Sequence, residues 1–101
     1  MEAPLQHEAF ASNLNTIFQV STDNAETIAA TLVAVSELTL SARQERFAIV
    51  FRLPNEPFLG QGMRRLQHES MGEIDLFLVP ISSDDEGTCY EAVFNRVVQN
   101  T

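Results

Sequence analysis

The chain has 101 residues, of which 45% are hydrophobic, so it can form one domain with a modest core but not two. Fourteen acidic residues stand against six arginines and no lysine, and the formal charge of −8 excludes a general affinity for nucleic acid or for anionic membrane surfaces. Without lysine the chain also lacks the residue for Schiff-base catalysis and for a lysine-containing phosphate loop.

Three features of the sequence bear on where the protein is located. Cys89 is the single cysteine and cannot form an internal disulfide. Residues 1–7 are acidic and polar, whereas a signal peptide begins with a basic and then an apolar segment. No apolar run reaches the length of a membrane span. We therefore expect synthesis in the cytoplasm without a signal peptide or membrane insertion, and export as part of an extracellular assembly stays open.

The first elements are a helix and a strand. Residues 4–14 predict a short helix, since Pro4 suits the first helical turn and apolar residues recur on one side. Asn15 tolerates the left-handed conformation in which helices often end. The run TIFQVS at 16–21 predicts the first strand.

The alanines of residues 27–40 are compatible with a helix, whereas the alternation of side-chain types is compatible with a strand. Apolar residues recur at every second position and β-branched residues lie between them, which favours a strand. We expect a bend or bulge in this strand near Ser36 and Glu37.

The middle of the chain predicts two strands and an irregular loop. Residues 46–53 alternate between large apolar and other side chains, as a strand with one buried face does. The loop that follows holds two prolines and two glycines, and we expect its Phe58 and Leu59 to fold back as a plug on the core. Residues 63–69 predict a short strand.

A β-hairpin ends the chain. Two strand-like runs, 73–81 and 88–97, flank a cluster of Ser, Asp, Glu and Gly that is typical of a turn. Apolar residues on both parities of the first run predict burial on both of its faces toward its end. With about six strands and one short N-terminal helix, residues 1–101 predict a single all-β domain, an antiparallel barrel or a small sandwich.

Three stretches resemble a small bacterial family of domains of unknown function, about one hundred residues long. They are RFAIVFRLPNEPFLGQG from Arg46, GEIDLFLVP from Gly72 and YEAVFN from Tyr90. The chain departs from the family at Asn15, where glycine is common, and at Met63-Arg64, where threonine or tyrosine is usual. Members are often encoded beside proteins that look like phage-tail collar or fibre components. The resemblance therefore implies a part in a tail-like or extracellular fibre assembly and carries no catalytic motif.

No cluster of residues predicts catalysis, a metal or another cofactor. His7, His68 and Glu69 lack the spacing of metal ligands. The acidic run 84–87 lacks the alternating ligands of a calcium loop and reads better as a hairpin turn. Cys89 with His68 has no recognisable third catalytic group and reads better as a half-buried filler.

The arginines and acids of the strands allow two interpretations. Glu73, Asp75 and Glu91 lie on the hairpin, and Arg46, Arg52 and Arg96 lie on strands that could flank them. Cross-strand ion pairs on the wet face are the simpler interpretation. The alternative is charge complementarity between subunits, for which arginine is well suited.

We expect a non-enzymatic structural or interaction subunit that associates with itself or with another subunit of the same assembly. The candidate contact residues are Leu5, Phe10, Phe58, Leu59, Arg64 and Arg65. The alternative is a monomeric adaptor or a small barrel that binds one apolar ligand, although a six-stranded barrel leaves little interior room.

Overall fold

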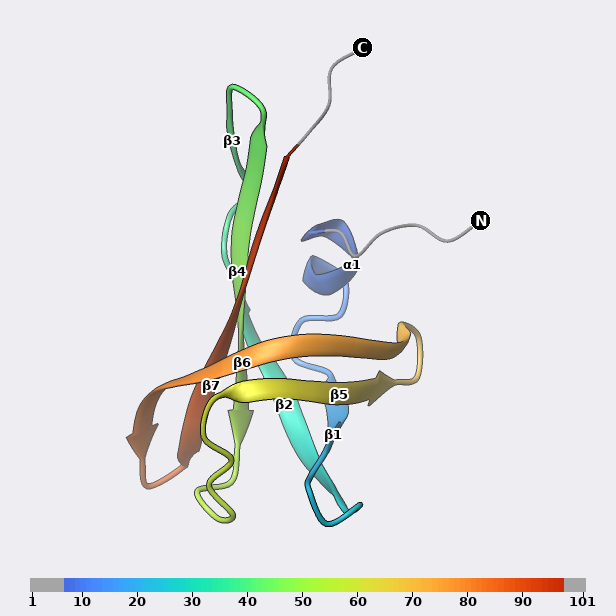
Figure 1. The fold of residues 1–101 in the computed structure, drawn as a ribbon, viewed down its shortest axis with the longest axis vertical. Coiled ribbons are helices and arrows are strands. Elements are labelled where there is room, and N and C mark those ends of the chain that lie inside the picture. Colours follow the sequence, from blue (N-terminus) through green and yellow to red (C-terminus); the bar gives the residue numbers. More distant parts are fainter. Residues whose placement is uncertain (1–6, 98–101) are drawn as a thin grey trace.

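In the computed structural model, which describes residues 7–97, a short helix precedes a set of antiparallel strands (Figure 1). The elements are α1 (His7–Ala11), β1 (Ile17–Ser21), β2 (Thr27–Val35), β3 (Thr39–Ser41), β4 (Gln44–Leu53), β5 (Gly62–His68), β6 (Gly72–Asp84) and β7 (Gly87–Val97). The strand order is β2-β1-β5-β6-β7-β4-β3, and pairing of β2 with β4 closes six of the strands into a barrel. The predicted antiparallel barrel with one short helix is confirmed, and β3 is an additional strand.

Alternation along the strands fills the barrel. In β4 the side chains of Phe47, Ile49, Phe51 and Leu53 are buried, as the sequence predicts, and the residues between them are more exposed. The same pattern in the other strands adds a second set of core residues: Phe18, Val20, Ala30, Leu32, Leu66, Ile74, Leu76, Leu78, Tyr90 and Ala92. Burial of this apolar area is the main source of the stability of the fold.

The single strand predicted over residues 27–40 is wrong, because the structure divides it into β2 and β3. Beyond Val35 the chain leaves β4 for three residues and returns as β3. Ser36 marks the departure: its main-chain N–H donates to the carbonyl of Ala48, and its hydroxyl accepts the N–H of Ala48, each at 2.8 Å. A hydroxyl thus takes the place of a backbone acceptor, and the regular ladder stops there. The bend expected near Ser36 and Glu37 therefore lies where the strand ends, and a separate register shift in β2 lies between Leu32 and Ala34.

The C-terminal hairpin forms as predicted, with its turn between Asp84 and Gly87. Burial on both faces of its first strand is wrong, because Phe77 and Ile81 on the outer side of β6 are about half exposed. This side is the outer wall of the barrel, and the described part of the chain packs no further layer over it. A register shift beside Pro80 accommodates a residue that cannot donate to the ladder.

β4 and β7 continue past the barrel as a twisted ribbon, which is visible at the top of Figure 1. β6 pairs with β7 only as far as Glu91 and then runs beside β5. We call β3, residues 44–48 of β4 and residues 92–97 of β7 the arm. The arm contributes to an elongated shape, 46 Å along its longest axis.

α1 packs on the inner face of the arm. The ring of Phe10 lies 5.3 Å from that of Phe94 and 6.2 Å from that of Phe47. The described helix ends at Ala11, earlier than the predicted residue 14, and residues 12–15 continue it as hydrogen-bonded turns. Asn15 has the predicted left-handed conformation, with φ of 70°, and its N–H donates to the carbonyl of Leu32 in β2.

Candidate interaction surfaces

Leu59 closes the end of the barrel to which the loop after β4 returns. Its N–H donates to the Tyr90 hydroxyl at 3.1 Å, and its carbonyl accepts from Arg64 at 2.6 Å. Its side chain packs against the core, so the predicted plug is confirmed for Leu59. The prediction is wrong for Phe58, which is 62% exposed. Phe58 therefore adds apolar surface to this end of the barrel.

Arg64 and Arg65 form no basic patch, because alternation along β5 sends them to opposite sides of the barrel wall. The Arg64 side chain is only 11% exposed and reaches Asp23 at 3.3 Å as well as Leu59. Its guanidinium thus connects the turn between β1 and β2 to the loop after β4. Arg64 was expected on a contact surface, and the structure instead places it among contacts within the barrel.

Arg65 points outward and forms the best-defined ion pair of the outer wall. Its Nε donates to Asp75 at 3.0 Å, and Glu73 lies 3.8 Å from the same guanidinium. The hydrogen bond from Arg65 lowers the pKa of Asp75, and the same bond raises the pKa of Arg65. From the sequence, Glu73 and Asp75 were expected to face Arg46, Arg52 or Arg96. Their neighbour is instead β5, which only the pairing of the strands shows.

Two further ion pairs use arginines of the expected set, although with other partners. Arg96 donates to Glu45 at 2.8 Å within the arm, and Arg52 lies 3.6 Å from Glu86 of the hairpin turn. Both pairs join neighbouring strands or turns of one chain. They fit the simpler interpretation of the charges, in which exposed pairs contribute little individually.

Two of the expected contact residues lie at the N-terminal end of the chain. Phe10 is 0% exposed, so the expectation that it forms a contact surface is wrong: its ring fills the space between α1 and the arm. Helical spacing alone did not show which side of so short a helix is covered. Leu5 lies outside the described residues.

The outer wall carries apolar side chains that the sequence did not indicate as contact residues. Met63 of β5 lies directly opposite Phe77 of β6, and the two are 62% and 49% exposed. Val93 of β7 is also exposed on the outer side. We call Met63, Phe77 and Val93 the outer apolar row. The only signal in the sequence was that the first hairpin strand has apolar residues at its outward-facing positions as well. These residues were expected to be buried.

His68 has a structural role at the turn between β5 and β6. Its Nδ1 accepts the N–H groups of Ser70 and Met71 at 3.0 and 3.2 Å. The Thr16 hydroxyl donates its proton to the carbonyl of Asn13, so Nε2 of His68, 2.9 Å from that hydroxyl, must be the donor in their hydrogen bond. One ring nitrogen therefore holds the turn itself, and the other connects the turn to the segment before β1.

The other candidates for chemistry lie apart. His68 is paired with Gly72 at the start of β6, whereas Cys89 is paired with Ser82 near its end, about 30 Å away along an extended strand. These two residues cannot form a nucleophile and base. Within residues 7–97, no three His, Cys, Asp or Glu side chains gather as metal ligands. In the hairpin turn, Asp84 accepts the N–H of Glu86, as an aspartate that stabilises a turn does.

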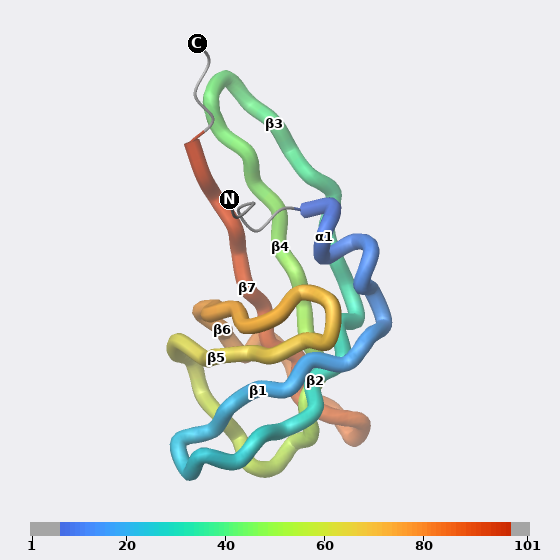
Figure 2. The backbone as a smooth tube through the Cα atoms, turned by 90° about the vertical axis from the view of Figure 1, so that its right-hand side faces the viewer, coloured from blue at the N-terminus to red at the C-terminus, as the bar shows by residue number. Residues whose placement is uncertain are grey.

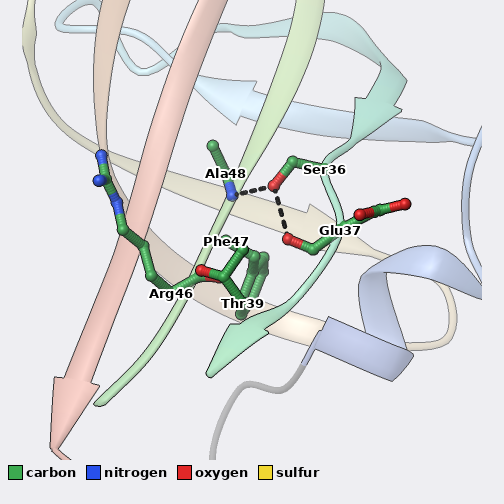
Figure 3. A pocket seen from close by; sticks show the side chains of 6 residues that line it. All are labelled: Ser36, Glu37, Thr39, Arg46, Phe47 and Ala48. Atoms are coloured by element: carbon green, nitrogen blue, oxygen red, sulfur yellow. Dashed lines mark hydrogen bonds between the residues drawn. The ribbon is translucent and has the colours of Figure 1, made fainter. Parts of the chain in front are cut away.

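Two shallow hollows lie beside the arm. One, of about 240 Å³, lies where the chain leaves β4 after Ser36 (Figure 3). The side chains of Arg46 and Glu37 point away from each other there, and Phe47 lies between the two strands (Figure 3). A second, of about 280 Å³, lies between α1 and the arm and is lined by His7, Glu8, Leu38, Glu45 and Arg96.

These surfaces belong to a small antiparallel barrel domain with a projecting arm. Over residues 5–94 the chain matches the family described as domain of unknown function DUF6916, and it belongs to that family. Comparison with curated proteins and with solved structures gave no match. Within the described residues, no helix is long and apolar enough to cross a membrane.

Proposed function

We propose that this domain is a non-enzymatic structural or interaction subunit of a larger, homomeric assembly of the phage-tail-like or extracellular fibre kind. The observation that carries the proposal is the amount of apolar side chain left on the surface of so small a domain. Leu40 and Val97 of the arm, Phe58 of the barrel end and Met63 of the outer apolar row are each more than 60% exposed. Met63 is also the direct neighbour of the half-exposed Phe77, and contiguous apolar side chains on a surface mark interaction sites.

The tail-like or fibre context comes from the resemblance to a family whose members are often encoded beside tail-collar or fibre components. Membership of the DUF6916 family is consistent with this context and does not supply a function of its own. The expected setting is a bacterial protein made in the cytoplasm, with a second copy or another subunit of the assembly as its partner.

The engagement of the polar side chains supports a role without catalysis. The two terminal nitrogens of Arg64 and both ring nitrogens of His68 are bonded to neighbouring loops and turns, and Cys89 lies far from His68, the partner expected for it. In a hydrolase or transferase these groups would face a shared cleft. We accordingly propose no cofactor and no metal for this domain.

The packing of the barrel favours association over the alternative of a ligand-binding barrel. Inward side chains meet across the interior, as where the rings of Phe18 and Phe51 lie 5.1 Å apart edge to face. A barrel that holds an apolar ligand needs this space for the ligand. A monomeric adaptor remains the second candidate, which differs from the first in solution mass.

The test of the proposal is the mass of the protein by light scattering over a dilution series, with negative-stain microscopy of the same samples. Rings, tubes or fibres, or a mass that rises with concentration above 11.3 kDa, would support a self-associating subunit. A mass of one chain at every concentration would favour the adaptor.

A test that deletes the N-terminal segment has to leave the buried core intact. Removing residues 1–10, which is the truncation that the sequence suggests, also removes the buried ring of Phe10. A truncation of residues 1–6 leaves α1 in place. If the N-terminal segment contributes to assembly, this shorter truncation lowers the mass in solution while the thermal unfolding midpoint stays within a few degrees.

A further inference from the structure

β7 loses its partner strand on one side halfway along its length. β6 pairs with this side only as far as Glu91, which lies opposite Val79, and then turns away toward β5. β7 continues beside β4 alone and borders the arm in Figure 2. Among residues 7–97, no strand pairs with this side of residues 92–97, a length of about 20 Å. We call it the open edge of β7.

The pairing of β4 shows which backbone groups lie on the open edge. Ala48 exchanges both of its main-chain hydrogen bonds with Ser36, on the side away from β7. Its partner in the ladder is Val93, which must therefore also point its N–H and C=O away from β4. By the same alternation, Asn95 and Val97 point theirs in the same direction. Three residues thus present a regular row of donors and acceptors.

The open edge has little of the protection that blocks strand addition, because its one inward charge, Arg96, is already paired within the chain. Natural edges are protected by lysine, proline, a bulge or an inward charge. Residues 92–97 contain no proline, lysine or acid, and their register with β4 is continuous. The single charge, on Arg96, is paired with Glu45 of the same chain at 2.8 Å. Counted together with Glu45, the edge carries no net charge, in a chain of charge −8.

We propose that a second copy of this chain pairs with the open edge, antiparallel and with a two-fold axis through Asn95. Asn95 then faces its own copy, and Val93 faces Val97 in both directions, so each pair exchanges two backbone hydrogen bonds. The two valines share the outer side and are exposed, so their contact buries apolar surface. On the inner side, Phe94 faces Arg96 of the other copy, a pairing of aromatic ring and cation.

A second copy fits this edge better than a foreign strand because the edge is complementary to itself. Two copies meet where neither brings net charge, whereas most other contacts would bring acidic surfaces together. The joined arms form one sheet in the order β3-β4-β7-β7-β4-β3 across the axis. The inference deepens the proposed homomeric function and depends on it, since it names the surface through which copies meet.

Amide hydrogen exchange, followed residue by residue by NMR across a dilution series, tests the pairing in the unmodified protein. The amides of Val93, Asn95 and Val97 are expected to exchange slowly when concentrated and to lose that protection on dilution. The amides of Phe94 and Arg96 bond to β4 and are expected to stay protected at all concentrations. Concentration-independent exchange at Val93, Asn95 and Val97, fast or slow, would overturn the inference.

Two charge variants test the register. In V93K/V97K, lysine faces lysine in both outer pairs, and the dimer dissociation constant is expected to rise at least about tenfold. In V93K/V97E, lysine faces glutamate in the same two pairs, and association is expected to recover to within about threefold of the unmodified protein. The second variant is the matched control, because it places charges at the same exposed positions. Equal dissociation constants for the two variants would contradict the register.

A third variant tests the backbone row itself. N95P removes an N–H that points away from β4, so the internal ladder keeps its bonds, whereas N95A keeps the N–H. Loss of two intersubunit hydrogen bonds predicts about a tenfold weaker dimer for N95P and little change for N95A. If all the variants self-associate equally while dilution still changes the mass, another surface joins the copies and the proposed function stands. If the unmodified protein is monomeric throughout, both fail.

Discussion

At the scale of single residues, Gly87 is the position with the least freedom. Its φ of +146° lies outside the range of other residues, and a Cβ there would collide with the carbonyl oxygen of Leu53 in the neighbouring strand. Gly72 has a φ of +76° but open space around it. Both glycines precede a strand residue in the sequence, but only Gly87 has a neighbouring strand where a side chain would lie.

G87A is expected to lower the free energy of unfolding by about 2–4 kcal/mol, from backbone strain and the displacement of β4. G72A is the control and is expected to cost only about 1 kcal/mol, because the backbone of an alanine there would be strained but its Cβ would collide with no atom. Urea denaturation of the two variants measures both values. Equal losses would mean that the hairpin turn relaxes away from Leu53.

The Arg65–Asp75 pair makes a pH-dependent contribution. Because the hydrogen bond from Arg65 lowers the pKa of Asp75 below 3.8, the stabilisation is present above that pH and disappears as the pH falls through the lowered value. D75N is therefore expected to be slightly less stable than the unmodified protein near pH 7, and the difference is expected to vanish in the acid range below the lowered pKa.

Urea midpoints of D75N and of the unmodified protein, measured at several pH values, check this expectation. E73Q serves as the control, because Glu73 lies 3.8 Å from the same guanidinium and makes no hydrogen bond to it. A stability difference for D75N that grows toward acid pH would contradict the assignment.

At the scale of elements, Phe10 is the only side chain of α1 that is fully buried, and His7 adds a contact of 2.8 Å to the carbonyl of Ser36. Phe10 is the buried residue of a five-residue helix, and helices this short do not persist in water without packing. F10A is expected to cost about 3–5 kcal/mol and to release the helix from the arm.

Chemical denaturation together with the NMR shifts of Phe47 and Phe94 measures the F10A effect. The control is L14A, since Leu14 follows the helix and is 42% exposed, and it is expected to cost less than 1 kcal/mol. A small loss for F10A would show that the arm is stable without its helix.

The elements also show how far the sequence predicts the structure. The strand around Phe47 and the terminal hairpin were predictable, because period-two alternation and turn residues act locally. The division between β2 and β3 was not, because it depends on a hydroxyl of Ser36 that bonds to Ala48 in another strand. Local patterns indicate which side chains share a face and do not indicate which strand lies beside them.

The same limit applies to the contact candidates. Alternation implied that Arg64 and Arg65 face opposite ways, but the acceptors that allow Arg64 to be buried, Asp23 and the carbonyl of Leu59, come from a different turn and loop. Phe77 was expected to be buried because it is apolar, and its exposure follows from the lack of a covering layer in residues 7–97. The surfaces of interest were therefore visible only in the folded chain.

At the scale of the whole molecule, charge and apolar surface act in opposite directions. A charge of −8 on 101 residues opposes the approach of two copies at low ionic strength, whereas the outer apolar row and the open edge are the surfaces through which we propose that copies meet. Self-association is therefore expected to strengthen as salt screens the repulsion. Binding to a basic partner would weaken under the same change.

The measurement that tests the central claim most directly is sedimentation equilibrium of the unmodified protein over a range of concentrations, at low and at physiological ionic strength. A homomeric subunit predicts an average mass that rises with concentration and is higher at the higher ionic strength. A mass of 11.3 kDa at every concentration and in both buffers would contradict the account.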